Sequence, residues 1–426
     1  MALTHAAFTT EKAGEDEKAF IADIRRILCG EPSEMTLPER FALLFDPACS
    51  QCYVTLFQRG QKPLRWGARR ATLFESISRA VEGLRNCSGF GAIDPADASG
   101  CRIMVEMVTE SHACDLQKIT GTSLSIHRFE PGVTGLRFES EGRRHYFMPT
   151  DAMTHSIMSV RQLLNFLSKR LGVSERTHKI SERVEMVRSM DARCSFIKSI
   201  AIVSYEEEVL PLYRGIPVPV TLSVQNIEMS LRNSVAWLAE NLKTDGRVLY
   251  FYDPISDSEV DFQHPNMTDP TYYNILRHCG GTITLLMGYE RFGDDRMLKA
   301  ARRSLDYFVT TLKTHHVEGT DACYPFYNGK SKLGGAGIGL SAIMHYKRLT
   351  GDGRYRKYAE GLVHHILSRI EPDGEMVGYF LHPAFRNGAP LTNVTDDEKR
   401  GLFSFYYPGE ALLGLALYYQ YAGTMA

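Results

Sequence analysis

Two similar stretches occur in the second half of the chain: Asp245-Gly246-Arg247-Val248-Leu249-Tyr250-Phe251 and Asp373-Gly374-Glu375-Met376-Val377-Gly378-Tyr379. Each follows a segment with the apolar spacing of an amphipathic helix, one ending near Leu242 and the other near Ile370. Asp-Gly is a strong turn signal, so each helix is expected to end in a tight turn. A loop rich in aromatic and polar side chains follows each turn. The chain therefore repeats a structural unit.

A second repeat lies between these stretches. An apolar helix that contains or follows a Gly-Gly pair stops at Gly293-Asp294, and another stops at Gly351-Asp352. An amphipathic helix begins directly after each stop. This pattern predicts an all-α array of helical hairpins, the arrangement of solenoids and α/α toroids. The predicted helices span residues 228–242, 272–292, 295–312, 335–349, 355–370 and 409–421.

Six helices make three hairpins, which is half of a six-hairpin toroid. We therefore expect either a partial toroid or one that another subunit completes. The possible partners are a second copy of this chain or another protein. A non-catalytic surface for assembly is the alternative to an enzyme, because solenoid-like arrays commonly serve as binding surfaces.

Length and charge limit the classes of function. A chain of 426 residues is expected to form about two domains. Its net charge of −1 gives no overall basic field that would attract nucleic acid or anionic lipid. No segment approaches the ~20 apolar residues of a membrane-spanning helix. The polar first twenty residues and nine scattered cysteines favour a cytoplasmic protein with reduced thiols and no membrane insertion.

The first half of the chain reads as α+β. Short β-like runs occur at residues 52–57, 102–108, 136–138 and 145–148, and Gly, Pro or charged residues separate them. Helical spacing is present at residues 72–84 and 160–171. The Pro-rich stretch 210–219 is expected to be an extended connection. The predicted organisation is an N-terminal extension (1–39), an α+β domain (40–215) and a helical domain (216–426).

Several strings in the first half resemble the AMMECR1-like domain. They are Glu130-Pro131-Gly132-Val133-Thr134-Gly135-Leu136, Arg144-His145-Tyr146-Phe147-Met148-Pro149 and Tyr53-Val54-Thr55-Leu56-Phe57. The family usually carries an Arg-Gly-Cys-Ile-Gly signature, whereas this chain has Leu64-Arg65-Trp66-Gly67-Ala68. The signature cysteine is absent, so thiol chemistry is not transferred. The resemblance implies a fold for residues 40–210 rather than an activity.

The helical half is similar to the incomplete α/α toroids of glucuronyl C5-epimerases and, more distantly, to α/α-barrel carbohydrate-active enzymes. The strings that carry this resemblance are 272–278, Lys332-Leu333-Gly334-Gly335 and Tyr406-Tyr407-Pro408-Gly409-Glu410. In such toroids the loops that enter the inner helices gather at one end. Here those loops contain many aromatic and ionisable residues, as a sugar site requires. They include Tyr250, Tyr252, Asp253, Tyr327, Asn328, Lys330, Lys332, Tyr379, His382, Tyr406, Tyr407 and Glu410.

The start of the helix at 272–292 offers three candidates. Asn274 and His278 are four residues apart and therefore share a helix face, and Arg277 lies on a neighbouring face. In a functional interpretation His278 is a catalytic acid or base, and Asn274 or Arg277 binds a substrate hydroxyl or carboxylate. In a structural interpretation they form a polar layer between packed helices.

The remaining catalytic candidates are Tyr252, Tyr407 and Glu410. In an epimerase, Tyr252 and Tyr407 would face opposite sides of a sugar carbon, while Arg277 and Lys332 stabilise the anion that forms. In a hydrolase, Glu410 and Asp253 would be the acid and base. Tyr406 is a candidate substrate contact. The structural alternatives are aromatic packing for the tyrosines and a favourable helix-start carboxylate for Glu410.

No cofactor or metal is predicted. The Gly-rich run 334–339 lacks the Gly-Lys-Ser/Thr ending of a phosphate-binding loop, and close helix packing explains it better. Cys49-Ser50-Gln51-Cys52 has no matching second pair, as a structural zinc site would need. The leading hypothesis is a cytoplasmic enzyme, an epimerase or a hydrolase or lyase, that acts on a uronic acid or amino-sugar unit of a glycan precursor in polysaccharide biosynthesis. The alternative is a scaffold in a polysaccharide or peptide-modification system.

Overall fold

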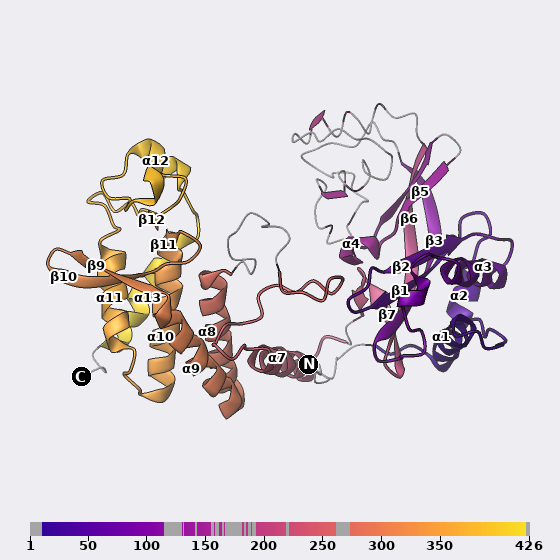
Figure 1. Ribbon diagram of the computed structural model, residues 1–426, viewed down its shortest axis with the longest axis horizontal. Helices are drawn as coiled ribbons and strands as arrows, with labels where there is room; N and C mark the ends of the chain where they lie inside the picture. Colours follow the sequence, from indigo (N-terminus) through magenta and orange to yellow (C-terminus); the bar gives the residue numbers. More distant parts are fainter. Residues whose placement is uncertain are drawn as a thin grey trace. The chain divides into compact units, whose positions relative to one another are not determined.

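The computed structural model describes residues 11–114, 132–140, 143–154, 193–218, 221–260 and 273–422, together with isolated residues between them. The chain forms two compact units. The first comprises Thr9–Leu222 with Pro254–Asp257, and the second comprises Ser223–Asp253 with Ser258–Ala426. Helices and antiparallel sheets are both present, so the protein is α+β (Figure 1). The division at residue 222 falls seven residues after the predicted boundary.

The first unit is built on an eight-stranded antiparallel sheet in the order β2-β1-β3-β6-β4-β5, with β7 paired to β6 and β8 paired to β7. Its longest strands, β3 and β6, pair with each other at its centre. The strands are β1 (Cys52–Gln58), β2 (Leu64–Ala68), β3 (Cys101–Cys114), β4 (Gly135–Ser140), β5 (Arg143–Phe147), β6 (Arg193–Tyr205), β7 (Glu208–Tyr213) and β8 (Ile216–Pro217).

The core of this unit lies between the sheet and three N-terminal helices. These are α1 (Glu15–Leu28), α2 (Glu39–Leu44) and α3 (Leu73–Arg85). Thr72 caps α3 by accepting the backbone N–H of Glu75, whose side chain accepts the N–H of Thr72 in return. Phe20 and Ile24 of α1 are completely buried in this core. Residues 15–28 of the predicted extension are therefore part of the first unit.

Over the described residues, the predicted strands at 52–57, 102–108, 136–138 and 145–148 and the predicted helix at 72–84 are present. Strands β2 and β6 and helices α1 and α2 were not predicted. The predicted connection at 210–219 contains β7 and β8, which extend the sheet instead of linking domains. Pro211 itself pairs with Ile202 of β6. The predicted helix at 160–171 lies largely outside the described residues. A four-residue helix, α4 (Asp151–Thr154), follows β5.

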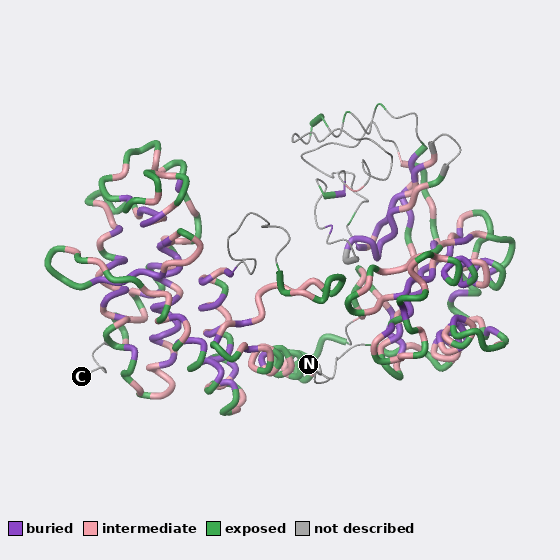
Figure 2. The backbone as a smooth tube through the Cα atoms, in the orientation of Figure 1, coloured by how far each residue is buried: buried purple, intermediate pink, exposed green. Residues whose placement is uncertain are grey.

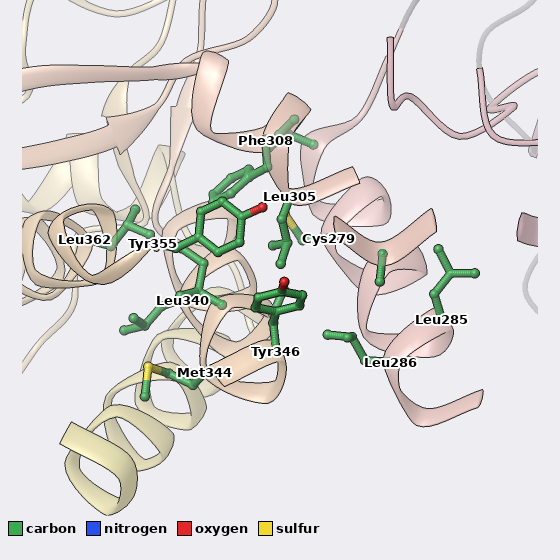
Figure 3. Packing of buried hydrophobic residues seen from close by; sticks show 14 of the residues in the cluster. Cys279, Leu285, Leu286, Leu305, Phe308, Leu340, Met344, Tyr346, Tyr355 and Leu362 are labelled. Atoms are coloured by element: carbon green, nitrogen blue, oxygen red, sulfur yellow. The ribbon is translucent and has the colours of Figure 1, made fainter. Parts of the chain in front are cut away.

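The second unit is a row of helices. All six predicted helices are present as α7 (Val224–Glu240), α8 (Ile275–Phe292), α9 (Asp295–Thr310), α10 (Leu333–Thr350), α11 (Arg356–Leu367) and α13 (Tyr407–Ala422), and a short α12 (Asp396–Gly401) precedes α13. Helix α10 packs against both α8 and α13. Its buried residues, including Leu340 and Met344, meet Leu286 of α8 and Leu305 and Phe308 of α9 in one core (Figure 3). Figure 2 shows this buried core along the helices and the exposed residues in the turns.

The predicted repeat is visible in backbone hydrogen bonds. Lys243 N–H donates to Arg247 O in the first Asp-Gly turn, and Glu371 N–H donates to Glu375 O in the second, both at 2.8 Å. Gly246 and Gly374 have φ of 93° and 86°, which favour glycine. An isolated antiparallel bridge closes each turn. The two turns therefore share one local structure.

The helix pairs between these turns also repeat. Gly293 after α8 and Gly351 after α10 adopt left-handed conformations, with φ of 66° and 72°. The aspartate that follows each glycine accepts the N–H two residues later, at 2.9 Å for Asp294 and 3.0 Å for Asp352. These turns join α8 to α9 and α10 to α11 as hairpins.

The second unit is not purely helical. It contains two small antiparallel sheets, formed by β9 (Leu312–Val317) with β10 (Thr320–Pro325) and by β11 (Ser331–Lys332) with β12 (Tyr379–Leu381). The prediction of an all-α half omitted both. Strands β11 and β12, of two and three residues, are too short to show an alternating pattern, whereas the six-residue strands β9 and β10 were missed. The β11–β12 pair nevertheless joins the entrances to α10 and α13.

Candidate functional site

The β11–β12 ladder brings two distant loops together. Lys332 of β11 pairs with Tyr379 of β12, and Leu333 N–H donates to Gly378 O at 3.0 Å. Lys332 is also the residue that precedes α10, so its side chain leaves the chain at the positive end of that helix. The segment that follows β12 leads through α12 into Tyr407 at the start of α13.

Five side chains gather at these entrances: Lys332, Tyr379, His382, Tyr407 and Glu410. We call them the Lys332 cluster. Nζ of Lys332 lies 5.9 Å from the centre of the Tyr407 ring. The hydroxyl oxygens of Tyr407 and Tyr379 are 3.5 Å apart, and the rings of Tyr379 and His382 are 5.1 Å apart. The cluster therefore combines a cation, a carboxylate, two phenols and an imidazole.

Gly334 provides the space for Glu410. A Cβ atom at position 334 would overlap Oε2 of Glu410 and would press on the Tyr407 ring. Oε2 of Glu410 is buried and has no hydrogen-bond partner among the described residues. A buried carboxylate oxygen without a partner is energetically costly, and a catalytic role or a bound water or ion would account for it.

Burial moves the pKa values of Lys332 and Glu410 toward each other. The pKa of the Lys332 amine is lowered by burial and by the charge of Lys330, while Glu410 opposes this change. The pKa of the Glu410 carboxyl is raised by burial, and Lys332 opposes that change. Each group therefore exchanges its proton more readily near neutral pH than it would in water, as acid–base catalysis requires.

His382 contributes a neutral imidazole. Burial and the charges of Lys330 and Lys332 lower its pKa. Its Nδ1 accepts the backbone N–H of Ala384 at 3.2 Å. In the neutral ring Nε2 then carries the proton. Nε2 can therefore donate a hydrogen bond to a ligand, whereas transfer of a proton to a ligand requires the imidazolium form.

An open depression borders the cluster at Lys332. It lies where α8 and α10 begin, and its walls include the rings of Tyr273 and Tyr327, whose centres are 5.7 Å apart. Asn328 holds the depression's edge by donating to Tyr273 O at 2.9 Å. Aromatic walls beside two lysines, Lys330 and Lys332, suit a ligand with apolar faces and a negative group.

The structure places His278 in the core rather than in this depression. Its side chain is fully buried, and both ring nitrogens are occupied. Nδ1 lies 2.6 Å from the Tyr273 hydroxyl, and Nε2 lies 2.9 Å from Ser304 O. Burial lowers its pKa to about 4, so the ring is neutral at physiological pH. This geometry is that of the structural interpretation, a polar layer between helices.

Asn274 and Arg277 have different surroundings. Helix α8 begins at Ile275, three residues later than predicted, and Asn274 is its cap. The Asn274 side-chain oxygen accepts the N–H groups of Leu276 at 3.0 Å and Arg277 at 3.4 Å. This oxygen is therefore engaged in helix capping, although the residue still lines the depression. The exposed guanidinium of Arg277 lies 5.5 Å from the Tyr250 ring centre.

The other predicted residues do not line the depression. Asp253 pairs through its backbone with Ser258 in the loop after the first Asp-Gly turn, and Tyr252 precedes it. Tyr406 is exposed, whereas its neighbour Tyr407 is half-buried. Of the nine predicted residues, Lys332, Tyr407 and Glu410 come together, and Asn274 lies nearby. The role of Gly334 was not anticipated, although its place in a Gly-rich run just after Lys332 was a signal.

In the described part of the chain, no set of three or more His, Cys, Asp or Glu side chains is arranged to hold a metal ion. Over the same residues, none of the helices has both the length and the apolarity needed to span a bilayer.

Comparison with known proteins assigns no family. No family model matches the chain, and no curated protein matches it. Among solved structures, it is similar to the crystal structure of an uncharacterized protein, PH0010, from Pyrococcus horikoshii. That similarity has 13% sequence identity and a TM-score of 0.34, and it covers 48% of this chain and 100% of that chain. A likeness this weak establishes neither a fold nor an activity here.

Proposed function

We propose that the second unit is a carbohydrate-active enzyme that moves a proton on a uronic acid or amino-sugar unit, most simply as an epimerase. The observation that carries this proposal is the buried, unpartnered Oε2 of Glu410 beside Lys332, with Tyr407 next to both. Burial makes both ionisable groups ready to exchange a proton. An aromatic depression with two lysines adjoins them.

The roles follow from the charges. Lys330 and Lys332 would bind the sugar carboxylate and stabilise the negative charge that develops when the neighbouring C–H proton is removed. The phenol oxygen of Tyr407 would accept that proton in its ionised form, which the charge of Lys332 favours. The electron pair of the broken C–H bond would be held in the carboxylate. A protonated His382 would return a proton from Nε2 to the opposite face of the carbon and become the neutral imidazole, the form that its lowered pKa favours.

This assignment differs from the sequence-based one in the group that returns the proton to the sugar carbon. Tyr252 was expected to face Tyr407 across the sugar, but His382 is the group that shares the cluster with Tyr407 through Tyr379. We also propose that the helical unit is a partial α/α toroid and that the first unit is an AMMECR1-like domain. The hairpins α8–α9 and α10–α11, with α8 and α13 both packed against α10, support the former.

Mass spectrometry in D₂O tests the proposal. The purified protein would be incubated with a panel of uronate and amino-sugar nucleotides and lipid-linked precursors. We expect deuterium gain without any other change in mass for at least one substrate. The gain should be lost in Tyr407→Phe and retained in Tyr406→Phe, which removes the same hydroxyl from the exposed neighbour.

The other outcomes have defined meanings. Fragmentation of a substrate would replace the epimerase with a hydrolase or lyase at the same residues. No change with any substrate would refute the enzyme for these sugars and favour the scaffold. Equal loss of exchange in both tyrosine variants would refute the role of Tyr407.

A further inference from the structure

Two cysteines face each other at one end of the longest strands of the first unit. Cys114, the last residue of β3, is directly opposite Cys194, the second residue of β6 (Figure 1). Opposite residues of an antiparallel pair point to the same side of the sheet, so the two side chains are neighbours. Among the strand residues that the structure describes, no other two cysteines are paired in this way.

The two thiols are already in contact. Cys114 and Cys194 are both reduced, and their side chains are hydrogen-bonded to each other. Directly opposite residues of an antiparallel pair have Cα atoms about 4.5–5.5 Å apart, and a disulfide normally spans about 4.4–6.8 Å. The strands β3 and β6 therefore do not have to separate or slide for a bond to form between the two sulfur atoms.

The surroundings of the two thiols give them different roles. Cys114 is partly exposed, so a small oxidant can reach its sulfur, whereas Cys194 is buried. The hydrogen bond with Cys114 and burial raise the pKa of the Cys194 thiol, and the charge of Arg137 opposes this change. Cys194 therefore keeps its proton and donates a hydrogen bond that stabilises the thiolate of Cys114. The thiolate is the form of cysteine that reacts with a disulfide.

The Cys-x-x-Cys spacing at residues 49–52 gives a different environment. Cys52 is completely buried, and burial raises the pKa of its thiol to about 12. The Cys49 thiol is directed at Asp46 and at the backbone oxygen of Thr109. Cys52 therefore stays protonated and out of reach of an oxidant. The contact between Cys114 and Cys194 comes from the register of two strands, not from closeness in the sequence.

We propose that Cys114 and Cys194 are a redox-sensitive pair, which a low-molecular-weight disulfide converts to a reversible disulfide that strengthens the first unit. The thiolate of Cys114 attacks one sulfur of the small disulfide, whose S–S bond breaks and releases a thiolate that takes up a proton. The product is a mixed disulfide on Cys114. This site is independent of the chemistry proposed for the second unit.

Cys194 completes the reaction. In the mixed disulfide Cys114 no longer carries the negative charge that raised the pKa of Cys194. Cys194 gives its proton to solvent and attacks the sulfur of Cys114, which releases the second small thiol. The two cysteines together lose two electrons and two protons, and the small disulfide gains them. A small thiol in excess reverses both steps.

The disulfide would hold together a large part of the first unit. It would join β3 to β6 across residues 115–193, which include β4, β5 and α4. Asp151 of α4 contacts Arg65 of β2, so the buried ionic network takes one member from this enclosed part. A cross-link across a long stretch restricts the unfolded chain and so stabilises the folded one. Oxidation should therefore make the first unit harder to unfold.

Peptide mapping of the full chain tests the pair. The purified protein would be equilibrated with mixtures of oxidised and reduced glutathione, quenched with acid, unfolded and labelled with a maleimide. With oxidised glutathione in excess, mass spectrometry should find a peptide that links Cys114 to Cys194. The link should disappear after treatment with dithiothreitol. Mapping distinguishes the link from glutathione attached to an exposed thiol such as Cys29.

Three variants separate the roles of the cysteines. Cys194→Ser should stop at the mixed disulfide and carry one glutathione on Cys114, whereas Cys114→Ser should leave Cys194 reactive with the maleimide. Cys49→Ser is the matched control, because Cys49 and Cys114 are both partly exposed, and it should still form the link. Oxidation should raise the melting temperature of the first unit by about 5–15 °C in the unmodified chain and in the control. Neither of the other two variants should show this rise.

Four results would overturn the proposal. The first is that Cys114 and Cys194 remain reactive with the maleimide at every ratio of oxidised to reduced glutathione, a result that needs no variant. The second is a link that joins other cysteines instead. The third is a Cys194→Ser chain without glutathione on Cys114. The fourth is a Cys114–Cys194 link that leaves the melting temperature unchanged, because the bond would then not strengthen the first unit.

Discussion

The Tyr273 hydroxyl fixes the proton position on the His278 ring. It lies 2.6 Å from Nδ1 and accepts the backbone N–H of Val248 at 3.1 Å. Ser304 O, 2.9 Å from Nε2, can only accept, so Nε2 carries the proton of the neutral ring. Nδ1 must then accept the Tyr273 proton. A single chain of donors therefore runs from Val248 through Tyr273 and His278 to Ser304.

Breaking this series of hydrogen bonds should destabilise the protein. Tyr273→Phe leaves the Val248 N–H and His278 Nδ1 without partners inside the core, at a cost of about 1–3 kcal/mol in the free energy of unfolding. Urea denaturation measures the change. Tyr419→Phe is the control, because that hydroxyl belongs to a largely exposed side chain. Equal stability of the two variants would contradict the hydrogen-bond chain.

The same histidine should make stability depend on pH. Its pKa is about 4 in the folded protein, because of burial, against about 6.5 when unfolded. The unfolded chain binds the proton more readily between these values, so stability is complete above pH 6.5 and declines as the pH falls toward 4. The full contribution is about 3 kcal/mol. Other buried histidines, including His365, act in the same direction.

His278→Gln isolates this contribution. The variant should lose less stability than the unmodified chain between pH 6.5 and pH 5, although it is less stable at pH 7. Urea denaturation at each pH gives the comparison. Parallel curves for the two proteins would show that His278 is not the group responsible.

Replacing glycine by alanine at two helical positions should change the stability of the protein in opposite directions. Gly334→Ala places a methyl group against Glu410 and the Tyr407 ring, and we expect a loss of about 1–3 kcal/mol together with lower activity. Gly280→Ala on α8 meets no atom within 4 Å and should stabilise by about 0.5–1 kcal/mol. Thermal unfolding of both variants measures the contrast. A harmless Gly334→Ala would exclude the close contact with Glu410.

The cluster should show a characteristic pH–rate profile once a substrate is found. Glu410→Gln and Lys332→Met should each lower the rate by about 100-fold or more. Burial raises the pKa of Glu410 and lowers that of Lys332, so the two limbs of the profile should lie closer together than for free carboxyl and amino groups. Each variant should remove one limb. Retention of both limbs in either variant would assign the titration to other residues.

The first unit contains a buried ionic network that offers a separate test. Arg65 of β2 pairs with Glu106 at 2.8 Å and also contacts Asp151, and Ser199 donates to Glu106 at 2.7 Å. Arg65→Met should cost about 3–5 kcal/mol, because it leaves buried carboxylates without a cation. Arg79→Met removes an exposed partner of Glu82 and should cost less than about 1 kcal/mol. Similar costs in urea denaturation would contradict the difference in burial.

The helices were predictable because each carries a strong local signal. Gly293 and Gly351 each end a helix in a left-handed conformation, and Asp294 caps the next helix, so no distant residue is needed. The strands β7 and β8 were missed because proline at 211 and 217 disfavours a strand, whereas pairing with β6 outweighs that preference. Pairing within the sheet, rather than local sequence, therefore determines β7 and β8.

The site was only partly predictable for the same reason. Lys332, Tyr407 and Glu410 stand at helix starts, and alternate helices of a hairpin array start at the same end, so their convergence follows from the repeat. The environment of His278 depends on Ser304, which is 26 residues away in another helix. The approach of Tyr379 to Lys332 depends on a ladder of two-residue and three-residue strands. Neither has a signal in the local sequence.

The two Asp-Gly turns each close on their own residues, between Lys243 and Arg247 and between Glu371 and Glu375. Neither of these closing hydrogen bonds comes from a neighbouring hairpin. Each turn can therefore form from its own residues before other helices pack on it, as Arg303 of α9 does by donating to Lys243 O in the first turn. Local closure of this kind lets a helical array assemble hairpin by hairpin along the chain.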